Sequence, residues 1–105
     1  MFLISGQKSR DQNTINRKMV ARDFDVLVSP RFNIGDTTYQ VILDGHHAYD
    51  AAIQANVIPN YIIASQECLP IIRYLDDGEV YKFLDVCLVD LDHFVLASSD
   101  TKVIF

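Results

Sequence analysis

Four apolar runs along the chain have the length and composition of β-strands. They are rich in β-branched and aromatic residues and are bounded by glycine, proline or aspartate. The four runs cover residues 2–5, 25–30, 38–44 and 57–65. Pro30 ends the second run, and Gly35-Asp36 is a turn signal between the second and the third. We therefore expect the second and third runs to pair as a hairpin with a longish loop.

Two segments between these runs carry helical signals. Thr14 can cap a helix over residues 15–23, in which apolar residues recur at helical spacing. This expected stripe consists of Ile15, Met19, Val20 and Phe24. Residues 47–56 are rich in alanine, Asn56 can form a left-handed C-cap, and Pro59 blocks continuation of the helix. A compact strand–helix–strand crossover follows, which predicts that residues 57–65 run parallel to residues 38–44.

Beyond Ser65 the apolar pattern is weaker. Residues 65–77 predict a helix with Pro70 in its first turn and Gly78 after its end. Residues 79–96 fit two patterns, since VCLVDL and HFVLAS have strand composition although the apolar residues also form a helical stripe. That stripe comprises Val80, Phe83, Leu84, Cys87, Leu88 and Leu91. The tail predicts a terminal hairpin around Ser98-Ser99-Asp100.

Length and composition indicate one globular domain over residues 1–105. The chain has 105 residues, of which 50% are hydrophobic and 22% charged. The order of the elements predicts an α+β (mixed α/β) fold, with helices packed on a small mixed sheet. No apolar run is long enough to span a membrane, and the first residues do not form a signal peptide, so we expect a cytoplasmic protein. Cys68 and Cys87 lie in apolar patterns, which predicts two buried thiols in a reducing compartment.

The charges are distributed unevenly along the chain, whose formal net charge is -5. Acidic residues crowd the C-terminal part, at Asp76, Asp77, Glu79, Asp85, Asp90, Asp92 and Asp100. The basic residues of the first third are Lys8, Arg10, Arg17, Lys18, Arg22 and Arg31. An acidic total opposes unspecific binding to nucleic acid but leaves open a local basic face in the first third. The acidic half is a candidate surface for a protein partner.

The stretch VILDGHHAYDAA, residues 41–52, joins a strand directly to a helix through Gly45. Such a junction directs backbone N–H groups and the positive end of the helix dipole outward, where they can bind an anion. His46 and His47, in the first helical turn, can contact a phosphate or transfer a proton. Asp44 can cap the helix, orient a histidine or hold a metal. The pattern equally fits a purely structural turn.

The histidines do not predict a metal site. Adjacent residues near the start of a helix point about 100° apart, so His46 and His47 cannot easily share one ion. His93 is isolated in the sequence and adds no third ligand nearby. We therefore assign no metal-binding residues.

The stretch YQVILDGHHAYDAAIQANVIP resembles the ParB/sulfiredoxin superfamily, in particular its small ParB-like members with the motif Asp-Gly-His-His-Arg. The polar loop DQNTINRK, the helix and the strand upstream fit the same pattern. The resemblance covers residues 2–65, and residues 66–105 are unassigned. It implies a ParB/sulfiredoxin-like single domain whose helix N-terminus binds nucleotide phosphates, with ATP or CTP and Mg²⁺ as ligands. Gly45 matches the motif glycine, His46 stands where sulfiredoxins have a reactive cysteine, and His47 matches a phosphate-binding histidine.

Ala48 departs from this motif, because related sequences place arginine there. An arginine would give a bidentate phosphate contact that alanine cannot replace. Natural loss of activity and an engineered inactivation both remain open. The resemblance implies that His46, His47, Asp44 and the arginine position, Ala48, are catalytic. It implies phosphate binding by Gly45, His47, Arg10, Arg17 and Lys18.

Two functional hypotheses follow. The first is an enzyme that acts on nucleotide or nucleic-acid phosphates, namely an NTPase, a nuclease or a kinase-like phosphotransferase. Its expected setting is a toxin or a mobile-element effector that is inactivated at Ala48. Sulfiredoxin activity is not expected because His46 replaces the cysteine, nor partition-protein function because no helix-turn-helix domain follows. The second is a non-catalytic acidic binding protein, such as an inhibitor, an antitoxin or a nucleic-acid mimic. This second hypothesis is favoured if the acidic residues 76–92 form one contiguous exposed face and disfavoured if they are scattered.

Overall fold

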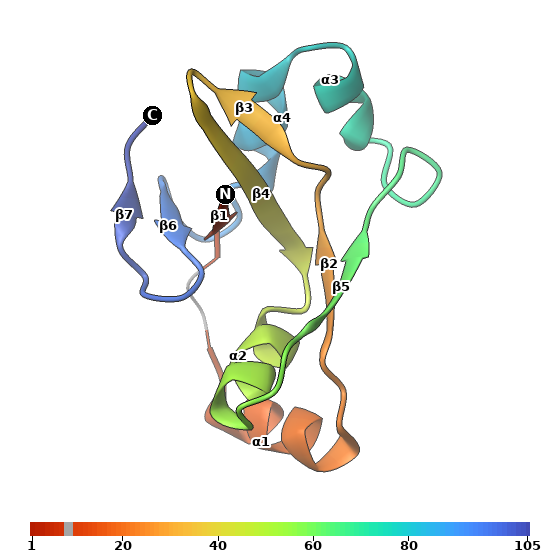
Figure 1. Ribbon diagram of the computed structural model, residues 1–105, viewed down its shortest axis with the longest axis vertical. Coiled ribbons are helices and arrows are strands. Elements are labelled where there is room, and N and C mark those ends of the chain that lie inside the picture. Colours follow the sequence, from red (N-terminus) through yellow and green to blue (C-terminus); the bar gives the residue numbers. More distant parts are fainter. Residues whose placement is uncertain (8–9) are drawn as a thin grey trace.

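Seven strands form one mixed sheet in the computed structural model, which describes residues 1–7 and 10–105 (Figure 1). The strands are β1 (Phe2–Ser5), β2 (Asp25–Val28), β3 (Phe32–Ile34), β4 (Thr37–Asp44), β5 (Asn60–Ile63), β6 (Phe94–Leu96) and β7 (Lys102–Val103). Their order across the sheet is β5-β2-β4-β1-β6-β7, and β3 also pairs with β4. With the four helices of the described ranges, they make a compact single-domain α+β protein.

The long strand β4 lies at the centre of the sheet. β1 pairs with it in parallel, and β2 pairs with it antiparallel, so the predicted pairing of residues 25–30 with 38–44 is confirmed. Part of the expected loop forms the short strand β3, which folds back on β4 through the predicted turn at Gly35-Asp36. Gly35 adopts a left-handed φ of 60°, as tight hairpin turns require.

The predicted direction of the strand after the crossover helix is wrong. β5 pairs in parallel with β2, from Asp25↔Asn60 to Val28↔Ile63. Because β2 is antiparallel to β4, β5 also runs antiparallel to β4. The physical reason is that β1 and β2 already occupy both edges of β4, so the returning chain joins the outer edge of β2 instead.

The first two helices, α1 (Gln12–Ala21) and α2 (His46–Gln54), lie together at one end of the molecule (Figure 1). α1 begins three residues earlier than expected, because Asp11 caps it instead of Thr14: Asp11 Oδ1 accepts a hydrogen bond of 3.1 Å from the Asn13 amide. α2 lies close to its predicted range. Asn56, which follows it, adopts a left-handed φ of 58°, as expected for a residue that ends a helix.

The C-terminal part contains two short helices at the opposite end of the molecule, α3 (Ile72–Asp76) and α4 (Val80–Cys87). The helix expected over residues 65–77 is therefore confined to five residues, with turns before it. Of the two patterns over residues 79–96, the helical one holds as far as Cys87, and strand structure begins at Phe94. The predicted terminal hairpin is confirmed, since β6 and β7 pair antiparallel.

The sheet has a hydrophobic cluster on each face. Along β2, Val26 and Val28 pack against α2. Leu27 points to the other face and packs on the cluster that includes Ile72 of α3 and Phe83 of α4. The α2 cluster consists of Val26, Val28, Ile42, Ala48, Tyr49 and Ala97. Since β1 and β4 are parallel, their C-terminal ends meet at the same end of the sheet, and α2 follows the end of β4 there.

The two cysteines differ in their surroundings. Cys87 is buried on α4 as expected, but the prediction that Cys68 is buried is wrong, because it lies in an exposed turn rather than in a helix. Both are free thiols, and burial raises the pKa of Cys87 to about 12. Within the ranges described, none of the helices has the length and apolar character needed to traverse a lipid bilayer.

Candidate functional site

Gly45 connects β4 to α2 in a conformation that only glycine adopts easily. Its φ is 93°, and a Cβ at this position would lie 2.6 Å from the carbonyl oxygen of Asp25. The Gly45 carbonyl accepts a hydrogen bond of 2.8 Å from the Tyr49 amide, which starts α2. The Gly45 amide donates to Asp44 Oδ1 at 2.8 Å. The direct strand-to-helix connection agrees with the prediction, and the structure adds that Gly45 lies close to the backbone of β2.

His46 is buried between α2 and the end of β1. Only 4% of the residue is exposed, and its Nε2 forms a hydrogen bond with the hydroxyl of Ser5, which is fully buried. The Ser5 hydroxyl also accepts a hydrogen bond of 3.0 Å from the Gln7 amide. Sequence reasoning missed Ser5. The signal for it was a polar residue ending an apolar strand, but only the parallel pairing of β1 with β4 brings it to His46.

Burial and, to a smaller extent, the positive charge of Arg10 lower the pKa of His46 from 6.5 to about 4. The carboxylate of Asp44 acts in the opposite sense but does not offset the burial. His46 is therefore neutral at pH 7. A neutral, enclosed imidazole serves as a hydrogen-bonding group that joins β1 to α2, and it offers no positive charge to a phosphate.

We expect the stability of the protein to decrease between pH 6.5 and about 4 because of His46. Its folded pKa is lower than its unfolded value, so the unfolded state binds the proton first, and the contribution is fully present above pH 6.5. The separation of the two values corresponds to about 3 kcal/mol. Urea unfolding at pH 7.5, 6, 5 and 4.5 measures this loss. Asp11 and Asp23 change the pH dependence of stability only at lower pH, because their pKa values are lowered from 3.8.

The control for this prediction is His46→Gln, which keeps a hydrogen-bonding side chain but does not titrate. Its free energy of unfolding should change much less than that of the native protein between pH 6.5 and 4.5. Equal pH dependence of the two proteins would contradict a buried neutral His46.

His47 lies in the first turn of α2, and the side chain of Arg10, which precedes α1, reaches α2. The His47 Nε2 accepts a hydrogen bond of 3.2 Å from the amide of Asp11, the residue that caps α1. Arg10 forms an ion pair with Asp50 of α2, with 2.5 Å between Nε and Oδ2. The structure thus brings two of the predicted phosphate-binding side chains to α2, although both bind other parts of the protein. Asp11 and Asp50, their partners, were not predicted.

The other two predicted basic residues, Arg17 and Lys18, are neighbours in the second half of α1. Arg17 is exposed and donates a hydrogen bond of 3.0 Å to Thr14 Oγ1. Lys18 forms an ion pair of 2.7 Å with Asp23. Of the two, Lys18 lines the hollow beside Gly45.

Ala48 faces the interior of the protein. It is fully buried in the cluster that Val26, Val28, Ile42 and Tyr49 form between β2, β4 and α2. A side chain at this position therefore points into the core and not toward the N-terminal end of α2. The interpretation of Ala48 as the place of a lost phosphate-binding arginine does not fit this geometry, because a guanidinium here would be enclosed by apolar side chains.

The hollow beside Gly45 has a volume of about 320 Å³ and an acidic lining. It is lined by Lys18, Asp23, Asp25, Leu27, Asp44, Gly45 and Ile62. Lys18 is paired with Asp23, whereas Asp25 and Asp44 form no ion pair within the described part of the chain. An anion at this place would be repelled by the carboxylates. Among the residues described, no group of three or more His, Cys, Asp or Glu is arranged to hold a metal ion.

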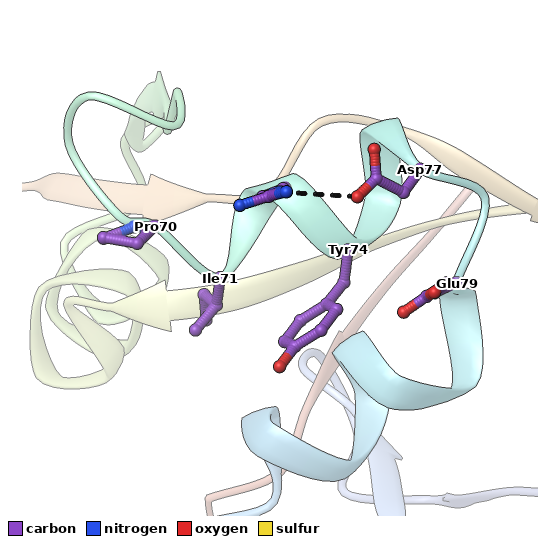
Figure 2. A pocket seen from close by; sticks show the side chains of 6 residues that line it. Pro70, Ile71, Tyr74, Asp77 and Glu79 are labelled. Atoms are coloured by element: carbon purple, nitrogen blue, oxygen red, sulfur yellow. Dashed lines mark ion pairs between the residues drawn. The ribbon is translucent and has the colours of Figure 1, made fainter.

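A second hollow, of about 440 Å³, lies at α3, where Tyr74 points toward α4 (Figure 2). It contains none of the predicted site residues. Its charged groups are partly compensated, since Arg73 and Asp77 are 3.5 Å apart, and Glu79 pairs with Lys82 at 3.2 Å. The acidic residues of the C-terminal half are exposed, but they are distributed over α3, α4 and the following loop, and several have local partners.

Comparison with known proteins gives no relative: no protein-family model matches the sequence, and neither a curated protein nor a solved structure matches it. The resemblance to the ParB/sulfiredoxin superfamily thus stays a prediction that rests on the motif at residues 44–47 and its flanking elements.

Proposed function

We propose that the protein is a non-catalytic binding domain that docks a partner protein on the open edge of its sheet. The observation that carries the proposal is β5, the last strand on its side of the sheet, whose four residues are all exposed. Tyr61, Ile62 and Ile63 expose 46%, 45% and 64% of their surface. Native proteins usually protect such edges, so an open edge with large apolar side chains is typical of a surface that pairs with another chain.

The closed junction at α2 supports a binding role over a catalytic one. His46 is enclosed, Ala48 belongs to the core, and the hollow beside Gly45 is lined by carboxylates. We retain the acidic binding protein, such as an inhibitor or antitoxin, but place its docking surface at β5 rather than at residues 76–92. We also propose a ParB/sulfiredoxin-like fold and a reducing cytoplasmic setting, which suits the free thiols of Cys68 and Cys87.

Selection from a displayed library of random ten-residue peptides tests this proposal. We expect segments that bind the native protein and lose binding to Ile63→Pro, because proline blocks pairing on the outer side of an edge strand. The matched control is Ile104→Pro, at a residue that is 83% exposed near the C-terminal end. Segments that bind all three proteins equally, or no enrichment at all, would contradict docking at β5.

A second candidate function is the phosphate enzyme that the resemblance implies, as a nuclease, NTPase or phosphotransferase. The observation that favours it is the position of Arg10 and His47 at the N-terminal turns of α2. Titration with ATP, ADP, CTP and GTP, with and without Mg²⁺, tests it. Binding or hydrolysis that Arg10→Ala removes would favour this enzyme over the binding domain.

A further inference from the structure

We infer that the β5 edge binds an extended partner segment in which apolar and basic side chains alternate. This inference rests on the proposed docking function and names the chemistry of the partner. It follows from three features of β5: the direction of its backbone groups, an apolar hollow on one face and an acidic hollow on the other.

The backbone of β5 has hydrogen-bonding groups on its outer side. The amides of Asn60 and Ala64 donate to the carbonyls of Phe24 and Val28, at 2.9 and 2.8 Å. Because these groups alternate in direction along a strand, the N–H and C=O groups of Tyr61 and Ile63 point away from β2. An added strand can pair with them and continue the sheet, as in recognition by β-strand addition.

The face of β5 that carries Tyr61 and Ile63 borders a large apolar hollow. Its volume is about 540 Å³, and it is lined by Met1, Leu3, Pro30, Arg31, Gln40, Tyr61 and Ile63. Alternate side chains of an added strand stand on this face, next to Tyr61 and Ile63. Apolar side chains at every second position of the partner would therefore pack against Tyr61 and Ile63, which border the hollow.

The opposite face of β5 borders the acidic hollow beside Gly45. Ile62 lines it together with Asp25 and Asp44, which form no ion pair within the ranges that the structure describes. The remaining side chains of an added strand project on this face. Lysine or arginine at those positions would complement the two carboxylates, whereas acidic residues would be repelled. Arg31 on the apolar side disfavours basic residues there, so the basic positions are confined to one face.

Charge also decides between a foreign segment and a second copy of this chain. Two copies that pair through β5 about a two-fold axis would bring both pairs of Asp25 and Asp44 to the same face. Each copy also carries a net charge of -5. A partner with basic residues removes this repulsion, which is why we choose it as the occupant.

Synthetic ten-residue peptides with blocked termini test the inference by fluorescence anisotropy. The sequences alternate valine with lysine, threonine or glutamate, and a fourth has the valine–lysine composition in scrambled order. We expect the alternating valine–lysine peptide to bind at least about tenfold more tightly than the threonine or scrambled peptide, and the glutamate peptide to bind least. Ile63→Pro should abolish binding of all four peptides.

A pair of matched double variants tests the charge preference. Asp25→Asn with Asp44→Asn keeps the oxygen acceptors for Asn60 and Gly45 but removes both charges, and should equalise binding of the lysine and threonine peptides. Asp85→Asn with Asp100→Asn removes two exposed charges elsewhere and should leave the preference unchanged.

The remaining outcomes separate the inference from the proposed function. If the threonine or scrambled peptide binds as tightly as the alternating lysine peptide, and Ile63→Pro removes this binding, the partner chemistry is wrong although docking at β5 stands. If library-selected segments bind at β5 but none of these peptides does, the inference likewise fails alone. A dimer in sedimentation experiments that Ile63→Pro dissociates would make a second copy the occupant. If neither the library nor these peptides yield binding, both proposals fail.

Discussion

Gly45→Ala is expected to lower the free energy of unfolding by about 3–5 kcal/mol, as measured by urea denaturation. Part of this loss is the cost of placing an L side chain in the left-handed region, which is about 1–2 kcal/mol. The rest arises because the new Cβ would lie 2.6 Å from Asp25 O and 3.1 Å from Val26 Cα. These atoms belong to the backbone of β2, so the contact can be relieved only if α2 or β2 moves.

Gly35→Ala is the matched control for this substitution. Gly35 has a φ of 60°, but a Cβ there would meet no atom within 4 Å. Its loss should therefore be limited to the conformational cost of about 1–2 kcal/mol. Equal losses at Gly35 and Gly45 would show that the close contact between the junction and β2 contributes nothing.

Ala48→Arg is expected to lower the free energy of unfolding by about 4 kcal/mol or more, and not to create nucleotide binding. The alanine is completely buried between β2, β4 and α2, so the guanidinium either loses its hydration or displaces the helix. Thermal and urea unfolding measure the stability. Titration with ATP and CTP in the presence of Mg²⁺ measures the nucleotide binding that the motif resemblance implies.

Ile53→Arg on the same helix is the control for Ala48→Arg. Ile53 is 56% exposed, so its replacement should change stability by no more than about 0.5 kcal/mol. If Ala48→Arg instead folds with native stability and gains affinity for ATP or CTP, the position faces a ligand. The interpretation of Ala48 as a lost arginine would then be correct.

Gly45 and Ala48 explain why the motif at residues 44–48 supports one functional hypothesis in the sequence and another in the tertiary structure. In the sequence, Asp44, Gly45, His46 and His47 have the residue types of an anion-binding turn. In the fold, Asp44 Oδ1 accepts the Gly45 amide, and Ser5 bonds to His46. The groups expected to face a ligand are thus largely used to hold β1, β4 and α2 together.

Several local features could be predicted because their signals lie within a few residues. The turn at Gly35-Asp36, the end of α2 at Asn56 and the terminal hairpin follow from turn and capping chemistry. The start of α1 was placed incorrectly, because Asp11 and Thr14 are both good caps and the sequence alone does not rank them. The helix predicted over residues 65–77 is longer than α3, because an apolar run with proline at its start fits turns as well as a helix.

The sequence by itself determined that four strands and two helices lie in the first two thirds, although not the short strand β3 or the start of α1. It also determined the glycine-dependent bend at position 45 and the acidic balance of the chain. These depend on side-chain periodicity, on backbone conformation and on composition. Only the tertiary structure decided that β5 joins β2, that His46 meets Ser5 and that Ala48 faces the core. It also decided that Asp25 and Asp44 line one hollow with Ile62 of β5. The reason is physical: each of these outcomes depends on which distant segments share a sheet edge or a face of α2, and short-range sequence signals do not encode that choice.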